Sequence, residues 1–237
     1  MNYFLIISLY ICIMKKIFLI LFLISVYVLN AETHIVTSSA DDGNGSLRKI
    51  VADASAGDTI LFASNIDKII LTSGHININK DITIIGNKER KTTINGNNNS
   101  KIFIVLGMQK SISLKIDNLI IENGKADATS GGIDVYNYCN LVANNCEFNY
   151  NEGAGGGGVF VLWDASFKAI NCSFNNNETS RAGGAGGAVC VNERGIFAAI
   201  NCAFIANSIF AVAVGANYYN ANSSFIAINC AFIENKS

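Results

Sequence analysis

Short apolar runs alternate with glycine- and asparagine-rich turns along most of the chain. The clearest runs hold four to six residues each and cover 158–163, 167–170, 188–191, 196–200, 210–214 and 225–228. They are too short for helices with a 3.6-residue period, and glycine or asparagine clusters bound them. This pattern is typical of short β-strands separated by turns, and it predicts an all-β fold.

One motif returns four times in the second half of the chain. An Asn-Cys pair is followed by Phe two residues after the Cys and by Asn three residues after the Phe. The Cys, Phe and Asn of the copies are Cys146, Phe148 and Asn151; Cys172, Phe174 and Asn177; Cys202, Phe204 and Asn207; and Cys230, Phe232 and Asn235. Glycine pairs keep step with this motif at 131–132, 157–158 and at Gly186 and Gly187, and more weakly at Gly215. Two motifs in step at one period predict a repeat architecture.

The length of the repeat distinguishes between the possible repeat folds. The four cysteines recur after 26, 30 and 28 residues, from 146 to 172, 202 and 230. A leucine-rich repeat would need a ladder of Leu, which this region lacks, and helical repeats would need long helical segments. Three short strands per period, each ending at a corner, form one coil of a parallel β-helix. We therefore expect a right-handed parallel β-helix over residues 59–237, with six or seven coils and its clearest repeats in 117–237.

Equivalent side chains of successive coils should form ladders, because strands of neighbouring coils lie ~4.8 Å apart. The Phe and Cys of the motif would fill the core. The Asn before each Cys would lie at a corner, where Asn tolerates the left-handed conformation; these are Asn145, Asn171, Asn201 and Asn229. A second corner would hold Asn123 with the last Asn of each copy. Residues 117–123 form a diverged first copy, with Asn118 at the Cys position and Ile120 at the Phe position.

Residues 1–31 have the layout of a secretory signal peptide. Lys15 and Lys16 precede the apolar run 17–29, and the stretch ends at Ala31. Met14, directly before the lysines, is an alternative start of the chain. A membrane anchor is the other interpretation, although two lysines in the middle of the apolar stretch would be costly inside a bilayer.

Residues 32–58 are expected to cap the open N-terminal end of the solenoid. A strand leads into a polar turn, and Ser46 then begins a short helix with Leu47, Ile50 and Val51 on one face. Gly57 would end that helix. A β-helix needs such a cover, since its first coil would otherwise present an unpaired edge and a wet core.

Two resemblances follow from these segments. Residues 41–62 resemble the CSLREAI-type segment that opens many bacterial surface β-helix proteins, with Gly45 where that family has Cys and Lys49-Ile50 where it has Glu-Ala. The alternating Gly-Gly-Ala-(Ile/Val) and Phe-x-x-Asn motifs resemble the repeats of the polymorphic outer membrane proteins, which are autotransporter adhesins. The resemblance implies an exported passenger-like binding protein, located at the outer membrane or surface of a bacterium or outside the cell, with a pectin lyase-like fold.

The sequence differs from the polymorphic outer membrane proteins in one respect. The polymorphic family continues into further repeats and a C-terminal membrane barrel, whereas this sequence ends at Ser237 without alternating barrel strands. We therefore expect a truncated solenoid without a transmembrane barrel. Its last coil would be open, and that edge could pair end to end with a second copy.

Composition and charge exclude only a few classes of function. A formal net charge of −1 gives no basis for nucleic-acid binding. Two His and no Cys-x-x-Cys argue against a metal site, and no cofactor motif is present. The ladder cysteines should be free thiols, because parallel Cβ atoms at the coil spacing lie beyond the distance of a disulfide. The state of Cys139 and Cys190, which lie off the ladder, stays open.

The acidic residues do not form the stacked set that a polysaccharide lyase or hydrolase would need. Glu147 is followed at its position by Ser173, Ala203 and Ala231, and Asp134 and Asp164 lie at different distances from their glycine pairs. The pair Glu193-Arg194 looks like a solvated turn. We therefore expect no enzyme activity, with a carbohydrate-active β-helix or a glycan-binding module as the alternative.

Aromatic side chains outside the repeat are the candidate contact residues for a host or matrix protein or a glycan: Tyr136, Tyr138, Trp163, Tyr218 and Tyr219. Packing of some of these rings between coils is the other interpretation.

Overall fold

The computed structural model describes residues 3, 7, 8, 10–17, 31–108, 110–180, 186–215 and 222–236. The chain divides into two compact units, Met1–Asn30 and Ala31–Ser237. Residues 10–17 of the first unit are helical. Among the described residues, no helix is long and apolar enough to cross a membrane. Most of the apolar run of the predicted signal peptide lies outside the described residues, so the signal peptide and its cleavage site stay predictions.

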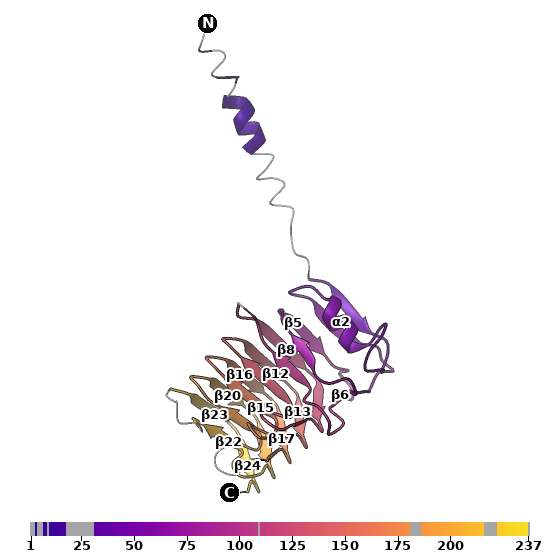
Figure 1. Ribbon diagram of the computed structural model, residues 1–237, viewed down its shortest axis with the longest axis vertical. Coiled ribbons are helices and arrows are strands. Elements are labelled where there is room, and N and C mark those ends of the chain that lie inside the picture. The colour runs from indigo at the N-terminus through magenta and orange to yellow at the C-terminus, as the bar shows by residue number, and fades with distance from the viewer. Residues whose placement is uncertain are drawn as a thin grey trace. The chain divides into compact units, whose positions relative to one another are not determined.

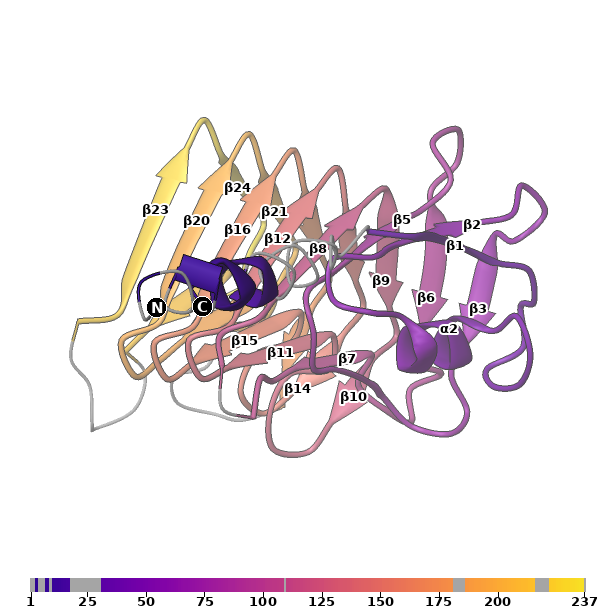
Figure 2. The same cartoon turned by 90° about the horizontal axis from the view of Figure 1, so that it is seen from above.

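The second unit is an all-β, right-handed parallel β-helix of about seven turns, as predicted. Figures 1 and 2 show its coils stacked in chain order, from the capping segment to the last strands. Three parallel sheets run along it. Sheet A consists of β1 (Thr33–Val36), β2 (Thr59–Phe62), β5 (Ile82–Ile85), β8 (Ser113–Asp117), β12 (Asn140–Asn144), β16 (Ser166–Ile170), β20 (Ile196–Ile200) and β23 (Ser224–Ile228).

Two further sheets complete each coil. Sheet B consists of β3 (Lys68–Ile70), β6 (Thr92–Asn95), β9 (Leu119–Glu122), β13 (Glu147–Asn149), β17 (Ser173–Asn175), β21 (Ala203–Ile205) and β24 (Ala231–Ile233). Sheet C consists of β4 (Ile76–Ile78), β7 (Phe103–Val105), β11 (Ile133–Tyr136), β15 (Val159–Leu162), β19 (Val189–Val191) and β22 (Val212–Val214). A short sheet D, between B and C in the chain, consists of β10 (Lys125–Ala126), β14 (Glu152–Gly153) and β18 (Glu178–Thr179).

Phenylalanine fills the core of the last four coils in two ladders. The predicted ladder is present on sheet B: Phe148, Phe174, Phe204 and Phe232 stack with ring centroids 4.7 Å apart. A second ladder, on sheet A, stacks Phe167, Phe197 and Phe225 at 4.8 and 5.0 Å. The two ladders meet edge to face, with centroids 6.0–6.4 Å apart. Stacked and T-shaped pairs are both favourable for aromatic rings, so each ring gains contacts beyond the burial of its area.

The ladder cysteines are free, as are the remaining cysteines that the structure describes. Cys146, Cys172 and Cys202 are buried, and the Sγ of Cys172 lies 3.2 Å from the carbonyl oxygen of Ile170. The hydrogen bond with the Cys146 thiol, together with burial, raises the pKa of the Cys172 thiol to about 12. The Cys172 thiol and burial also raise the pKa of the Cys202 thiol, so Cys172 and Cys202 are neutral and act as small apolar core residues. Cys139 and Cys190 are also buried and free.

The Asn that precedes each ladder Cys lies at the corner between sheets A and B. All four, together with Asn118 of the diverged first copy, have φ between 50° and 54°. Their amides bond from coil to coil: Asn229 donates to Asn201 at 2.8 Å, and Asn201 donates to Asn171 at 3.2 Å. The left-handed corner predicted from the sequence is confirmed, and Asn suits it because this conformation costs Asn less than most residues.

The last Asn of each copy forms a buried ladder at the end of sheet B. The Oδ1 of Asn177 accepts from the backbone N–H of Asn151 at 3.1 Å and from its Nδ2 at 3.0 Å. Asn177 in turn donates through Nδ2 to the carbonyl of Phe148 at 2.8 Å. The same bonds join Asn207 to the coils on either side of it. These side chains take the place of backbone pairing where the chain turns away from sheet B.

The register of the first copy differs from the prediction by one residue. Ile121, not Ile120, pairs with Phe148, and Glu122 pairs with Asn149. Asn123 therefore does not belong to the buried Asn ladder, because Gly124 occupies that position and donates its N–H to the Oδ1 of Asn151 at 2.9 Å. The length of the repeat varies, so a coil of 27 residues is as acceptable as one of 28. The spacing alone therefore did not show that Phe148 pairs with Ile121 and not with Ile120.

The glycine pairs mark a place where successive coils approach too closely for a side chain. A Cβ on Gly187 would lie 2.4 Å from the carbonyl oxygen of Ser208, and one on Gly157 would lie 2.2 Å from the carbonyl oxygen of Gly187. Both contacts are to backbone, which cannot move aside without disturbing the next coil. This close approach of the coils explains why the glycine pairs recur.

The last coil exposes apolar side chains. Ile226, Ile228, Phe232 and Ile233 are each about half exposed. Their strands, β23 and β24, are the terminal strands of sheets A and B. End-to-end association of two copies through this coil stays a prediction.

The capping segment combines a strand and a helix. Strand β1 pairs in parallel with β2, and α2 (Leu47–Asp53) buries Leu47 and Val51 against the first coil. Ser46 caps the helix, as predicted, by accepting from the N–H of Lys49 at 3.2 Å. The helix ends at Asp53, with Ala54 as its C-cap, so the expected end at Gly57 is wrong. The Nζ of Lys80 donates to the carbonyl of Ala54 at 2.7 Å and also to the carbonyls of Val51 and Ala52. Lys80 thus satisfies carbonyl groups at the end of the helix that a C-terminal glycine would otherwise help to satisfy.

Two carboxylates fasten this cap. Asp41 accepts from Arg48 at 2.7 Å and from the N–H of Ser73 at 2.6 Å, so it ties the cap to the first coil. Asp58 accepts from the N–H of Glu32 at 2.9 Å and lies 2.7 Å from the Nε2 of His34. For Asp41, burial opposes ionisation, but the hydrogen bonds from Arg48, Ser73 and Thr72 prevail and lower its pKa to about 2. The N–H of Glu32 and the His34 ring lower the pKa of Asp58 to about 2 as well.

The cap should therefore loosen in acid before the rest of the solenoid. Both carboxyl pKa values lie below the ordinary 3.8, so the stability that these groups contribute is complete above about pH 4 and is lost as the pH falls through about 2. We expect the opening free energies of β1 and α2, measured by hydrogen exchange, to fall between pH 4 and 2 while those of β12 and β16 change little. Asp58→Asn should weaken the cap at pH 5 and reduce this dependence. An equal loss of protection in all strands would contradict the prediction.

Candidate functional site

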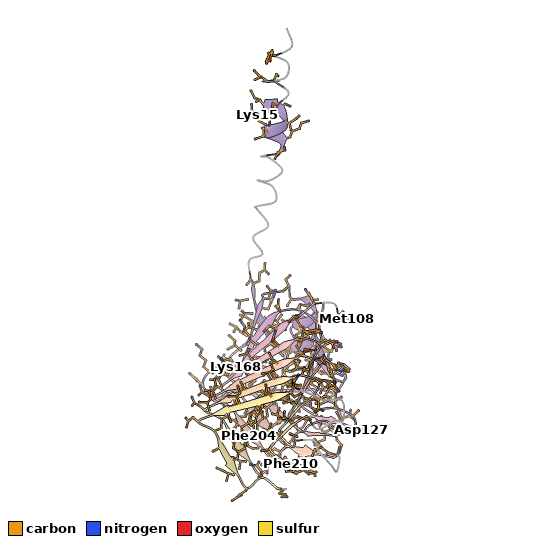
Figure 3. The ribbon with its side chains drawn as sticks, turned by 90° about the vertical axis from the view of Figure 1, so that its left-hand side faces the viewer. Lys15, Met108, Asp127, Lys168, Phe204 and Phe210 are labelled. Carbon is orange, nitrogen blue, oxygen red and sulfur yellow. The ribbon has the colours of Figure 1, made fainter. Side chains whose placement is uncertain are left out.

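Three successive coils bring exposed polar and aromatic residues together where sheet C turns into sheet A. We call this the C–A corner; it consists of Asn137–Tyr138, Trp163–Asp164 and Glu193–Arg194, one pair from each coil. The turns are joined by hydrogen bonds from the N–H of Tyr138 to the carbonyl of Trp163 and from the N–H of Asp164 to the carbonyl of Glu193, both 3.0 Å. Met108, 84 % exposed, lies in the corresponding turn of the preceding coil (Figure 3).

All six residues of the C–A corner are in the left-handed region, with φ between 50° and 64°. Asn137 suits this conformation, but Trp163 and Glu193, which take the equivalent position in the next two coils, do not. A bulky aromatic residue with positive φ is a genuine outlier. Such strain persists where the surrounding structure over-determines it, and it clusters at functional sites.

The structure places two of the five predicted contact residues, Tyr138 and Trp163, at this corner and a third, Tyr136, directly beside it. Tyr138 is 63 % exposed and Trp163 is 47 % exposed. Tyr136 is partly buried: its ring lies 5.6 Å from that of Trp163, tilted by 37°, and 6.4 Å edge-on from Phe160. Tyr136 therefore packs against rings of the next coil, which is the other interpretation given for these aromatic residues, and it supports Trp163. Tyr218 and Tyr219 lie outside the described residues.

An ion pair crosses the corner beside the aromatic rings. Asp164 and Arg194 form a bidentate pair, with Nε–Oδ1 at 2.8 Å and Nη2–Oδ2 at 2.6 Å. The Arg194 guanidinium holds the pKa of Asp164 below its usual value, with a smaller contribution from the Tyr138 hydroxyl. Sequence analysis treated Arg194 as solvated and missed this pair. A signal was present: Asp164 and Arg194 are 30 residues apart, and so are the ladder residues Cys172 and Cys202.

A buried carboxylate lies on sheet C behind the corner. Asp134 is 0 % exposed, and its oxygens accept from the Nζ of Lys101 at 2.5 Å, the hydroxyl of Ser130 at 2.7 Å and the hydroxyl of Tyr136 at 3.1 Å. The N–H of Ser130 also donates to it, at 2.9 Å. These donors hold the segment before β11 and the Tyr136 ring in place. Lys101 comes from the preceding coil, so sequence spacing did not reveal this cluster.

The cluster is poorly arranged for general acid–base chemistry. Burial, followed by the charge of Asp134, raises the pKa of Tyr136 well above its ordinary value, so its hydroxyl remains a donor. Asp134 accepts four hydrogen bonds, which leaves it little capacity to act as a base. His75 has a lowered pKa, caused first by burial and then by the charge of Lys101. Within the described ranges, no group of three His, Cys, Asp or Glu side chains could hold a metal ion.

Comparison with models of known protein families finds none that matches the chain, and comparison with curated proteins finds no match either. The functional argument therefore depends on the C–A corner itself.

Proposed function

We propose that this chain is an exported β-helix protein of a bacterial surface or its surroundings, and that it binds a partner without chemical catalysis, in the manner of an adhesin passenger. Its contact surface is the C–A corner. The observation that carries this proposal is Trp163, a half-exposed aromatic residue held in a backbone conformation that penalises it. A requirement for folding alone would favour Asn at this position, as at Asn137.

The surroundings of Trp163 support a role in binding. Aromatic and Arg side chains are enriched among residues that dominate binding energy, and rigid rings lose little entropy when they are covered. Trp163 is held by Tyr136, which is in turn held by Asp134. The alternative, a carbohydrate-active enzyme on the same fold, would need at least two carboxylates that act together. Here Asp164 is paired with Arg194 and Asp134 is buried, which among the described residues leaves Glu193 without a second carboxylate beside it to act with.

Trp163→Asn should weaken binding strongly without unfolding the chain. The substitution loses the contact with Tyr136, about 0.5–1.5 kcal/mol, but relieves a left-handed strain of about 1–2 kcal/mol, so stability should change little. Binding of unit 31–237 to host cells and matrix proteins should weaken by ~30-fold or more, as for a residue that contributes over about 2 kcal/mol. Thermal unfolding and surface binding would be measured together.

Tyr150→Asn is the matched control, because Tyr150 is also an exposed aromatic residue with positive φ, 55°, but lies at the corner that follows sheet B. It should raise stability slightly and leave binding intact. Equal losses of binding in both variants would show that the effect is not specific to the C–A corner. Unchanged binding of Trp163→Asn would remove the C–A corner from the proposal, and turnover of a polysaccharide by the purified protein would replace binding with catalysis.

A further inference from the structure

We propose that the ligand of the C–A corner is a neutral glycan, whose pyranose rings lie on Trp163 and Tyr138 while their hydroxyls bond to Asp164 and Arg194. This inference rests on the proposed function and names the chemical class of its ligand. Four properties of the corner support it: its aromatic surface, its hydrogen-bonding groups, its charge and its dimensions.

The aromatic surface suits the apolar C–H face of a sugar ring. Trp163 and Tyr138 occupy adjacent coils of one corner, and both rings are substantially exposed. The contact with Tyr136 at 5.6 Å restricts the rotation of the indole. A ring that is already held in place loses little entropy when a ligand covers it.

The ion pair beside the rings can bond to pairs of hydroxyls. Arg194 presents five N–H donors in a plane, of which the bidentate contact uses two. The carboxylate of Asp164 has further lone pairs beyond the two contacts with Arg194. Two neighbouring hydroxyls of a pyranose could therefore donate to Asp164 and accept from Arg194. The Arg194 side chain is 54 % exposed, so it remains accessible to such a ligand.

The charge of the corner selects against acidic sugars. The turns of Trp163 and Arg194 contain two carboxylates, Asp164 and Glu193, and one guanidinium, which is already paired with Asp164. A uronate or sialate brought here would lie beside this excess of negative charge. Lys101, behind the corner, is paired with Asp134. A neutral ligand avoids the repulsion and keeps the hydrogen bonds.

The spacing of the turns suits a short oligosaccharide. Coils are ~4.8 Å apart, so the three turns of the corner extend over ~10 Å, the length of about two sugar rings. A protein loop could also contact the aromatic rings, but it would not need paired donors and acceptors in one plane beside them. The planar Asp164–Arg194 pair therefore favours a diol over a peptide.

Fluorescence of the purified chain tests the proposal directly, because Trp163 is the one tryptophan of the sequence. We would titrate maltohexaose, cellohexaose and galactotetraose as neutral probes, with trigalacturonate and sialyllactose as acidic probes. We expect a saturable blue shift with at least one neutral probe and at least 10-fold weaker binding of both acidic probes. By calorimetry, Trp163→Asn should lose the binding and Arg194→Met should weaken it at least 10-fold. Tyr150→Asn, which replaces an exposed aromatic residue with positive φ outside the C–A corner, should retain it.

The outcomes separate this inference from the proposed function. Tighter binding of an acidic probe overturns the neutral class, and sugar binding that survives both Trp163→Asn and Arg194→Met overturns the site. If no sugar binds while attachment to cells or matrix proteins still depends on Trp163, the glycan inference fails and the proposed function stands. If the folded chain binds neither sugars nor cells nor matrix proteins, both fail.

Discussion

Replacing Asn177 with alanine should lower the free energy of unfolding by about 1–3 kcal/mol, because it leaves the buried backbone N–H of Asn151 without a partner. That N–H lies 3.1 Å from the Asn177 Oδ1. The carbonyl of Phe148, 2.8 Å from the Asn177 Nδ2, loses this donor as well but keeps its place in the ladder of sheet B. Asn177 is 0 % exposed and belongs to an inner coil, so water cannot easily replace the amide. Urea denaturation of the variant and the parent would measure the loss.

Asn175 provides the matched control for this prediction. It precedes Asn177 by two residues and also bonds to the neighbouring coil, with its Nδ2 donating to the Oδ1 of Asn149 at 2.8 Å, but its side chain lies on the partly exposed outer face of sheet B. Asn175→Ala should cost no more than about 1 kcal/mol, since solvent can satisfy the exposed partner. Equal effects of the two substitutions would contradict the difference in burial between the two ladders.

Phe174→Ala should cost about 3–5 kcal/mol, the usual range for removing a buried phenylalanine. Its ring is stacked on Phe148 and Phe204 at 4.7 Å and touches Phe167 and Phe197 edge-on at 6.2 and 6.3 Å. Stability of a solenoid is close to a sum of coils and their interfaces, so a cavity here weakens two interfaces at once. Thermal and urea unfolding should show the loss, together with a broader transition.

Phe232 is the control for position in the ladder. It stacks on Phe204 alone at 4.7 Å, meets Phe225 edge-on, and is 48 % exposed at the end of the ladder. Phe232→Ala should therefore cost less than half as much as Phe174→Ala. Phe174→Leu, which preserves more of the volume, should also cost less than the alanine variant. A Phe232 variant as unstable as Phe174→Ala would mean that the ladder is not the source of the stability.

The structure adds a functional argument to this account of stability. Most repeated positions hold the residue that their place in the coil requires: Asn at left-handed corners, Phe in the core, and Gly where coils approach. Trp163 and Glu193 depart from that rule at the equivalent of Asn137, as Tyr150, Ala206 and Glu234 do at the corner that follows sheet B. A local choice that conflicts with the fold without an evident structural gain is expected at functional positions. The departure at Trp163 is accompanied by exposure and by an ion pair, which is why the C–A corner is the candidate site.

Much of the architecture could be derived from the sequence because a solenoid repeats one local solution. The spacing of Cys146, Cys172, Cys202 and Cys230 determined the coil, and the ladder of Phe followed from the strand spacing. The corner conformation of the Asn residues followed from their tolerance of positive φ. The cap helix was predictable from Ser46 and the apolar face behind it, although its end was not, because Lys80 arrives from another coil.

Only the tertiary structure decided which residues meet between coils. The pairing of Lys101 with Asp134, the pairing of Arg194 with Asp164, and the support of Trp163 by Tyr136 all join residues of different coils. Their partners depend on the exact register, and variable turn lengths shift that register by a residue, as the pairing of Ile121 with Phe148 shows. Periodicity in the sequence thus determined the coil and its core, whereas contacts between coils determined the candidate site. The side chains that meet at a corner depend on the alignment of the coils, which the repeat length alone does not specify.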